Sequence, residues 1–149
     1  SDTVLLTNRA GMAEAVRSLT ARGHRRIAFV ANPASVHTVR ERLAGYRDAL
    51  AEAGVSETDR WLVLGDDPTA STRDAVVELM RSSDPPTAIV TGNNRATTAT
   101  LQALRDLESP CALIGFDDFE LAEMLGISVV AHDAHAVLVH RFQTRRRFR

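Results

Sequence analysis

The amino-acid sequence predicts an α/β fold built on a doubly wound parallel sheet of about five strands. Apolar runs of four to six residues alternate with helix-like segments, most of which have ten residues or more. Polar or glycine residues follow these runs, as they do in the loops of open α/β sheets. The 149 residues, of which 44% are hydrophobic and 25% charged, fit one globular domain.

The first half of the chain contains two of the predicted strands. Residues 10–22 have the apolar spacing of a helix that ends at Gly23. Residues 26–31 form a continuous apolar run, which is typical of a parallel strand buried on both faces. A second strand is predicted at residues 61–64, where a Gly-Asp-Asp-Pro turn follows.

The strongest helix signal begins just after the strand at residues 26–31. Thr38 is the predicted N-cap, Glu41 completes a capping box, and Gly54 ends the helix. Arg42 lies in the first turn, at the border of the apolar stripe. It is either a solvated helix residue or a guanidinium directed at a ligand. The stripe consists of Val39, Leu43, Tyr46 and Leu50.

The second half of the chain continues the alternation. A helix capped by Thr69 or Ser71 is expected to end near residue 82. The remaining predicted elements are a strand at 87–91, a helix at 95–107, a strand at 111–114, a short helix at 119–125 and a strand at 127–130.

The end of the chain differs from the rest. We expect a domain over residues 1–133 and an aberrant Arg-rich tail over residues 134–149. All 18 basic residues are arginine, and five of them lie in the last nine positions. The tail is either a disordered basic arm or a segment translated outside the natural frame. Because the chain does not begin with Met, we expect it to be a piece of a longer protein.

Charge and composition exclude several classes of function. Without the five tail arginines, the rest of the chain has 13 arginines and 19 acidic residues. Its net charge is therefore negative, which disfavours binding to nucleic-acid phosphates. No apolar run reaches the ~20 residues of a membrane helix, and no secretory signal opens the chain. The single Cys111 cannot form an internal disulfide, and we expect a cytoplasmic protein.

Common catalytic and cofactor motifs are missing from the sequence. It has no phosphate-binding loop, no dinucleotide fingerprint and no nucleophile elbow. Cys111 is predicted to lie in a strand, where burial disfavours a thiolate. The spacing of His132, Asp133, His135 and His140 matches no standard zinc site. We therefore predict no metal and no cofactor.

Polar side chains follow the predicted strands at their carboxyl ends. Carboxylates, an amide and a guanidinium on one sheet edge suit a polyhydroxylated ligand, because each accepts or donates two hydrogen bonds. Capping and turn formation are the alternative role for the same residue types. The residues are those from Ser35 to Thr38, together with Arg42, Asp67, Asn93 and Asp117.

Several segments, in the right order, resemble the C-terminal lobe of the effector-binding region of LacI/GalR-type transcriptional repressors. They are residues 23–28, 42–46, 86–89 and 114–118, flanked by 8–11 and 128–130. This region is related in fold to periplasmic sugar-binding proteins. The resemblance implies one lobe of a periplasmic-binding-protein-like fold.

The resemblance also implies roles for individual residues. Arg42 and Asp117 are the expected partners of sugar hydroxyls, and Asn93 and Thr38 match positions that often face the ligand. Two positions depart from the family pattern: Asp67 stands where an aromatic residue often follows Gly-Asp, and Asn94 stands where Asp is usual.

The implied function is that of a sugar-like effector-sensing and dimerisation lobe of a repressor. A homodimer is expected, with DNA contacted only through an N-terminal headpiece that this chain lacks. The isolated chain should bind its effector weakly and DNA not at all. The expected interface residues are Thr97, Thr98, Leu101, and Leu121 to Leu125.

Two other functions share this fold. A small α/β enzyme would use Asp67 or Asp117 as an acid or base, but the sequence offers no nucleophile–base pair. A solute-binding lobe of a transporter would have similar binding chemistry but would require an export signal.

Overall fold

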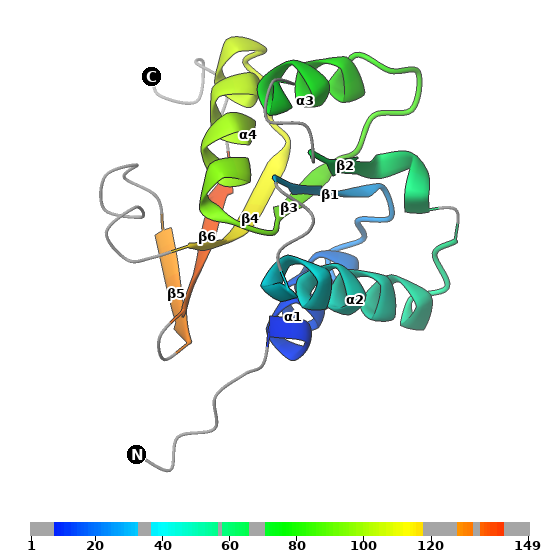
Figure 1. Cartoon of the computed structure of the whole chain (residues 1–149). Helices are drawn as coiled ribbons and strands as arrows, with labels where there is room; N and C mark the ends of the chain where they lie inside the picture. The colour runs from blue at the N-terminus through cyan, green and yellow to red at the C-terminus, as the bar shows by residue number, and fades with distance from the viewer. Residues whose placement is uncertain are drawn as a thin grey trace, which may run out of the picture.

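The computed structural model describes residues 8–32, 37–56, 58–65, 71–117, 128–132 and 135–141 (Figure 1). These residues form a six-stranded sheet with the strand order β2-β1-β3-β4-β6-β5. The strands are β1 (Ile27–Ala31), β2 (Leu62–Leu64), β3 (Ala88–Thr91), β4 (Ala112–Asp117), β5 (Ser128–His132) and β6 (His135–Arg141). The helices are α1 (Asn8–Thr20), α2 (His37–Glu52), a 3₁₀ turn (Thr58–Trp61), α3 (Thr72–Met80) and α4 (Asn94–Asp106).

The first four strands are parallel, which confirms the predicted fold class. In β1 every residue is buried, because successive side chains point to opposite faces and both faces are covered. Ile27 and Phe29 belong to one core, and Ala28 and Val30 to the other. The continuous apolar run of this strand therefore reflects two cores.

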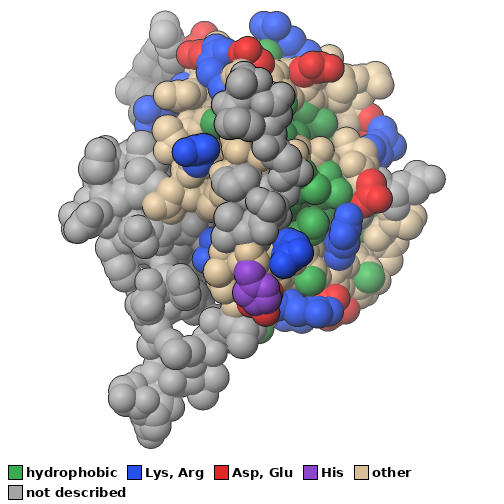
Figure 2. All heavy atoms as spheres, in the orientation of Figure 1, with side chains coloured by type: hydrophobic (Ala, Val, Ile, Leu, Met, Phe, Trp, Pro, Cys, Tyr) green, Lys and Arg blue, Asp and Glu red, His purple; other side chains and the backbone are tan. Residues whose placement is uncertain are grey.

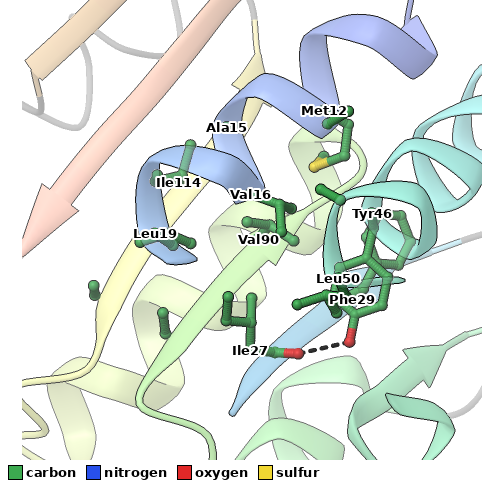
Figure 3. Packing of buried hydrophobic residues seen from close by; sticks show 14 of the residues in the cluster. Met12, Ala15, Val16, Leu19, Ile27, Phe29, Tyr46, Leu50, Val90 and Ile114 are labelled. Carbon is green, nitrogen blue, oxygen red and sulfur yellow. Dashed lines mark hydrogen bonds between the residues drawn. The ribbon is translucent and has the colours of Figure 1, made fainter. Parts of the chain in front are cut away.

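Two helical layers enclose the sheet (Figure 1). Helices α1 and α2 cover one face and α3 and α4 the other, as in a doubly wound fold. The α1–α2 side is filled by Met12, Val16, Leu19, Tyr46 and Leu50, which pack on Phe29, Val90 and Ile114 (Figure 3).

The last two strands depart from the all-parallel prediction. β6 pairs antiparallel with β4, and β5 pairs antiparallel with β6. Only residues 133 and 134 separate β5 from β6, and so short a connection permits a hairpin but not a parallel crossover. The predicted strand at 127–130 is thus the edge strand β5. β6 comes from residues 135–141, which the sequence analysis assigns to the tail.

The start of α2 also differs from the prediction. The helix begins at His37, so Thr38 lies inside the first turn and is not its N-cap. Capping at α3 agrees with one of the two predicted residues, because the Ser71 hydroxyl accepts a hydrogen bond from the Asp74 amide at 3.1 Å. No helix in the described part of the chain is both long and apolar enough to cross a membrane.

Candidate functional site

The carboxyl ends of β1 to β4 lie along one side of the sheet, which we call the carboxyl edge. It comprises Asn32 after β1, Gly65 after β2, the Gly92–Asn93 pair after β3, and Asp117 at the end of β4. β1 lies between β2 and β3, so the chain leaves β1 toward α2 and leaves β3 toward α4 on the opposite face. Such a switch point is where open α/β sheets bind ligands.

Arg42 reaches this switch point from α2. Its side chain is buried, with 8% of the residue exposed. Nη1 donates to the Gly92 carbonyl at 2.7 Å, and Nε donates to Asn8 Oδ1 at 3.0 Å. Arg42 is therefore not a solvated helix residue. Its hydrogen bonds fix the guanidinium against the loop that follows β3.

Asn93 is the N-cap of α4. Its Oδ1 accepts a hydrogen bond from the Ala96 amide at 3.0 Å. Its Nδ2 donates to the Asn32 carbonyl at 2.7 Å, and Oδ1 is also 3.4 Å from the Asn32 amide nitrogen. The side chain thus both starts a helix and joins two loops of the carboxyl edge.

Asn32 is the functional candidate that sequence reasoning missed. It is 7% exposed, and its Nδ2 donates to the Thr72 hydroxyl at 2.7 Å. An asparagine followed by proline reads as an ordinary turn in the sequence. The signal available was its position directly after a fully buried strand, at the predicted ligand edge.

The other predicted ligand residues are located less completely. Thr38 is partly buried in the first turn of α2, and Asp117 is the last residue of β4. Asp67 and the segment from Ser35 to Val36 lie outside the described residues. The structure therefore brings Arg42 and Asn93 together and leaves the placement of Asp67 as a prediction.

The predicted interface residues fall into two groups. Thr97 and Leu101 are 0% and 1% exposed, and Thr97 bonds to Thr91 Oγ1 at 2.6 Å. Both side chains are buried in the core of this chain, so we correct their assignment to an interface surface. Thr98 lies at the surface, in a shallow hollow shared with Asn94, Arg95, Ala99 and Gln102. Leu121 and Leu125 lie outside the described residues.

Other chemistry is weakly supported among the described residues. Burial raises the pKa of the Cys111 thiol to about 12, which disfavours the nucleophilic thiolate. Burial also raises the pKa of Tyr46, whose hydroxyl donates to the Ile27 carbonyl at 2.6 Å. On the face in Figure 2, arginine and acidic side chains are interspersed over the described atoms.

A family comparison fits this arrangement of strands and loops. Residues 2–109 match the family described as periplasmic binding proteins and sugar binding domain of LacI family. The chain belongs to this family. The parallel sheet and the polar residues at its carboxyl edge, over the matched residues, agree with membership of this family.

Individual relatives agree with the family. The chain is similar to a probable opine utilization operon repressor of Rhizobium rhizogenes, at 39% identity over 70% of this chain and 59% of that protein. It is 36% identical to the ribose operon repressor of Escherichia coli, over 74% of this chain and 35% of the relative. The chain therefore spans about a third of that repressor.

Solved structures give the same fold. A LacI-family transcriptional regulator from Rhizobium etli superposes with a TM-score of 0.70 at 28% identity. The match covers 80% of this chain and 46% of that chain. The described lobe is therefore a LacI-family effector-domain lobe in fold.

Proposed function

We propose that this chain is the effector-sensing and dimerisation lobe of a LacI/GalR-type transcriptional repressor. The family match and the relatives named as operon repressors support the class of protein. The observation that carries the proposal is Arg42, a buried guanidinium fixed at the switch point between β1 and β3. A soluble, cytoplasmic location is part of the same proposal.

The proposed effector is a small polyhydroxylated molecule of sugar-like chemistry. Hydroxyl groups both donate and accept, so they match a guanidinium, an amide and carboxylates placed together. The proposed site comprises Thr38, Arg42, Asp67, Asn93 and Asp117. The site lies at the switch point of the sheet, which is where open α/β folds bind ligands.

In the intact protein, a second lobe would close on the effector from the other side. The effector would then bias the relative orientation of the lobes, and through it the spacing of paired DNA-binding headpieces. The homodimer would use the outer surface of α4 around Thr98. We propose no catalytic step for this lobe, in line with relatives that are named as repressors.

The proposal is tested by saturation-transfer NMR of the chain with D-ribose, D-galactose, adenosine and octopine at millimolar concentration. We expect at least one probe to receive saturation from the wild-type protein, and Arg42→Ala to abolish the effect. Arg40→Ala is the matched control, because Arg40 is exposed on the same helix two residues away. Arg40→Ala should bind like the wild type.

The stability of the variants separates binding from folding. Arg42→Ala removes the guanidinium that donates to the Gly92 carbonyl, at a cost of about 1–3 kcal/mol, and circular dichroism should still show a folded chain. A folded Arg42→Ala variant that binds like the wild type would overturn the role of Arg42. No saturation transfer to any probe would contradict a sugar-like effector for this lobe.

A further inference from the structure

We infer that Asn32 is a positioning residue of the effector site, held in place by the side chains of Asn93 and Thr72. The inference rests on the proposed function for the site, but its structural part concerns the free protein. Its basis is a set of contacts in which Asn32 joins the loops after β1, β2 and β3.

The first contact closes the switch point. The backbone ladder between β1 and β3 ends where the Gly92 amide donates to the Val30 carbonyl at 2.8 Å. One residue further along, a side chain replaces the backbone as the donor: Asn93 Nδ2 donates to the Asn32 carbonyl at 2.7 Å. A side-chain amide thus bridges two loops that would otherwise separate toward opposite faces of the sheet.

The second contact reaches the start of α3. Asn32 Nδ2 donates to the Thr72 hydroxyl at 2.7 Å, and Thr72 is itself buried. This bond ties the end of β1 to the start of α3. Because buried polar groups that are hydrogen-bonded specify one geometry, the bond fixes the start of α3 against the carboxyl edge.

The third contact is steric. The Gly65 amide donates to the Ala31 carbonyl at 2.8 Å, which brings the β2 loop against Asn32. A Cβ built on Gly65 would lie 3.0 Å from Asn32 Cγ, so a glycine is what this close approach accommodates. The Asn32 side chain is therefore enclosed on the β2 side as well.

Asn93 makes contacts that also bear on the position of Arg42. Its Oδ1 already accepts from the Ala96 amide, and its Nδ2 already donates to Asn32. The neighbouring Gly92 carbonyl holds Arg42. The bridge from Asn93 to Asn32 therefore fixes the loop against which the proposed ligand-binding guanidinium is oriented.

The test begins with hydrogen exchange of the free chain. Thr72→Val removes the hydroxyl with little change of shape, and Thr72→Ser keeps it. We expect Thr72→Val and Asn32→Ala to speed exchange of the Gly65 amide at least tenfold. The Thr87 amide, bonded to Arg26 at the opposite edge of the sheet, should keep its wild-type rate. Thr72→Ser should restore the Gly65 rate.

Binding supplies the second readout. Thr72→Val removes the acceptor that orients the Asn32 amide, and Thr72 is not part of the proposed site. A positioning role predicts that Thr72→Val weakens binding of D-ribose and 2-deoxy-D-ribose by the same factor, about fivefold, and that Thr72→Ser restores the affinity. Wild-type affinity of Thr72→Val for D-ribose would overturn the inference.

The exchange and binding experiments distinguish a failure of the inference from a failure of the proposed function. If the wild type binds neither sugar, the proposed ligand class fails, and the exchange arm still decides whether Asn32 holds the loops. Wild-type exchange at Gly65 in both Thr72→Val and Asn32→Ala would overturn the positioning role whatever the binding result.

Discussion

At the residue scale, Cys111 shows how burial fixes the chemistry of a side chain. It precedes β4 and is 5% exposed. Burial raises the pKa of its thiol to about 12, whereas an exposed thiol has a pKa of about 8.5. The thiolate therefore forms more readily in the unfolded chain than in the folded chain.

The sign of the resulting pH dependence follows directly. Because the pKa is higher in the folded state, the buried thiol stabilises the fold fully below about pH 8.5. That contribution is lost as the pH rises toward about 12, and the loss is about 2 kcal/mol by pH 10. We expect Cys111→Ala to lose less stability than the wild type between pH 8 and pH 10, as measured by urea unfolding. Equal losses would contradict the burial of the thiol.

The sequence predicted that Arg42 and Asn93 lie at the carboxyl edge of the sheet, and the structure has them there. It did not predict the residues to which they are hydrogen-bonded. Arg42 lies at the border of an apolar stripe, which leaves its burial open, and only the crossing of α1, α2 and the β3 loop encloses it. Asn32 was missed because its importance comes from Thr72 and Asn93, which are 40 and 61 residues away. Contacts at such separations carry no local sequence pattern.

At the scale of elements, α1 and α2 cross at unusually short distance. Gly45 permits the approach, because a Cβ at this position would lie 2.1 Å from the Arg9 carbonyl oxygen. Exposed ion pairs flank the crossing, with Arg9 contacting Asp48 and Arg17 contacting Glu52. Exposed pairs contribute little to stability, so packing at Gly45 sets the geometry of the helix pair.

Substitution at this crossing gives a direct test. Gly45→Ala should destabilise the fold by about 2 kcal/mol, since the clash with backbone outweighs the helix propensity gained. Thermal unfolding measures the effect. Gly54→Ala is the control: its Cβ would meet open space, and only the φ of +75° makes it costly, by about 1 kcal/mol. A Gly45→Ala variant as stable as the wild type would contradict the close crossing.

Elements were predicted well wherever one local pattern decided them. The four parallel strands coincide with four of the apolar runs because burial on both faces leaves an unbroken signature. The start of α2 was misplaced by two residues, since Thr38 is a good capping residue wherever it lies. The β5–β6 hairpin was not predicted, because residues 135–141 were grouped with an Arg-rich segment that has no consistent face.

At the scale of the whole molecule, the chain spans only part of the length of its relatives. It covers 35% of the length of the ribose operon repressor and 46% of the Rhizobium etli structure. The proposed effector would contact only the carboxyl edge of this lobe, so weak affinity is the expected behaviour of the isolated chain. We propose that this edge, and no other surface of the lobe, recognises a sugar-like molecule.

Amide shift mapping of the isotope-labelled chain during titration with D-ribose distinguishes this edge from every other surface of the lobe. We expect saturable shifts at Asn32, Thr38, Gly65 and Gly92, while Arg26 and Thr87 at the opposite edge stay unchanged. Shifts confined to the opposite edge or to the outer surface of α4 would contradict the assignment of the site. The absence of shifts at millimolar sugar would contradict recognition of this ligand class by the lobe.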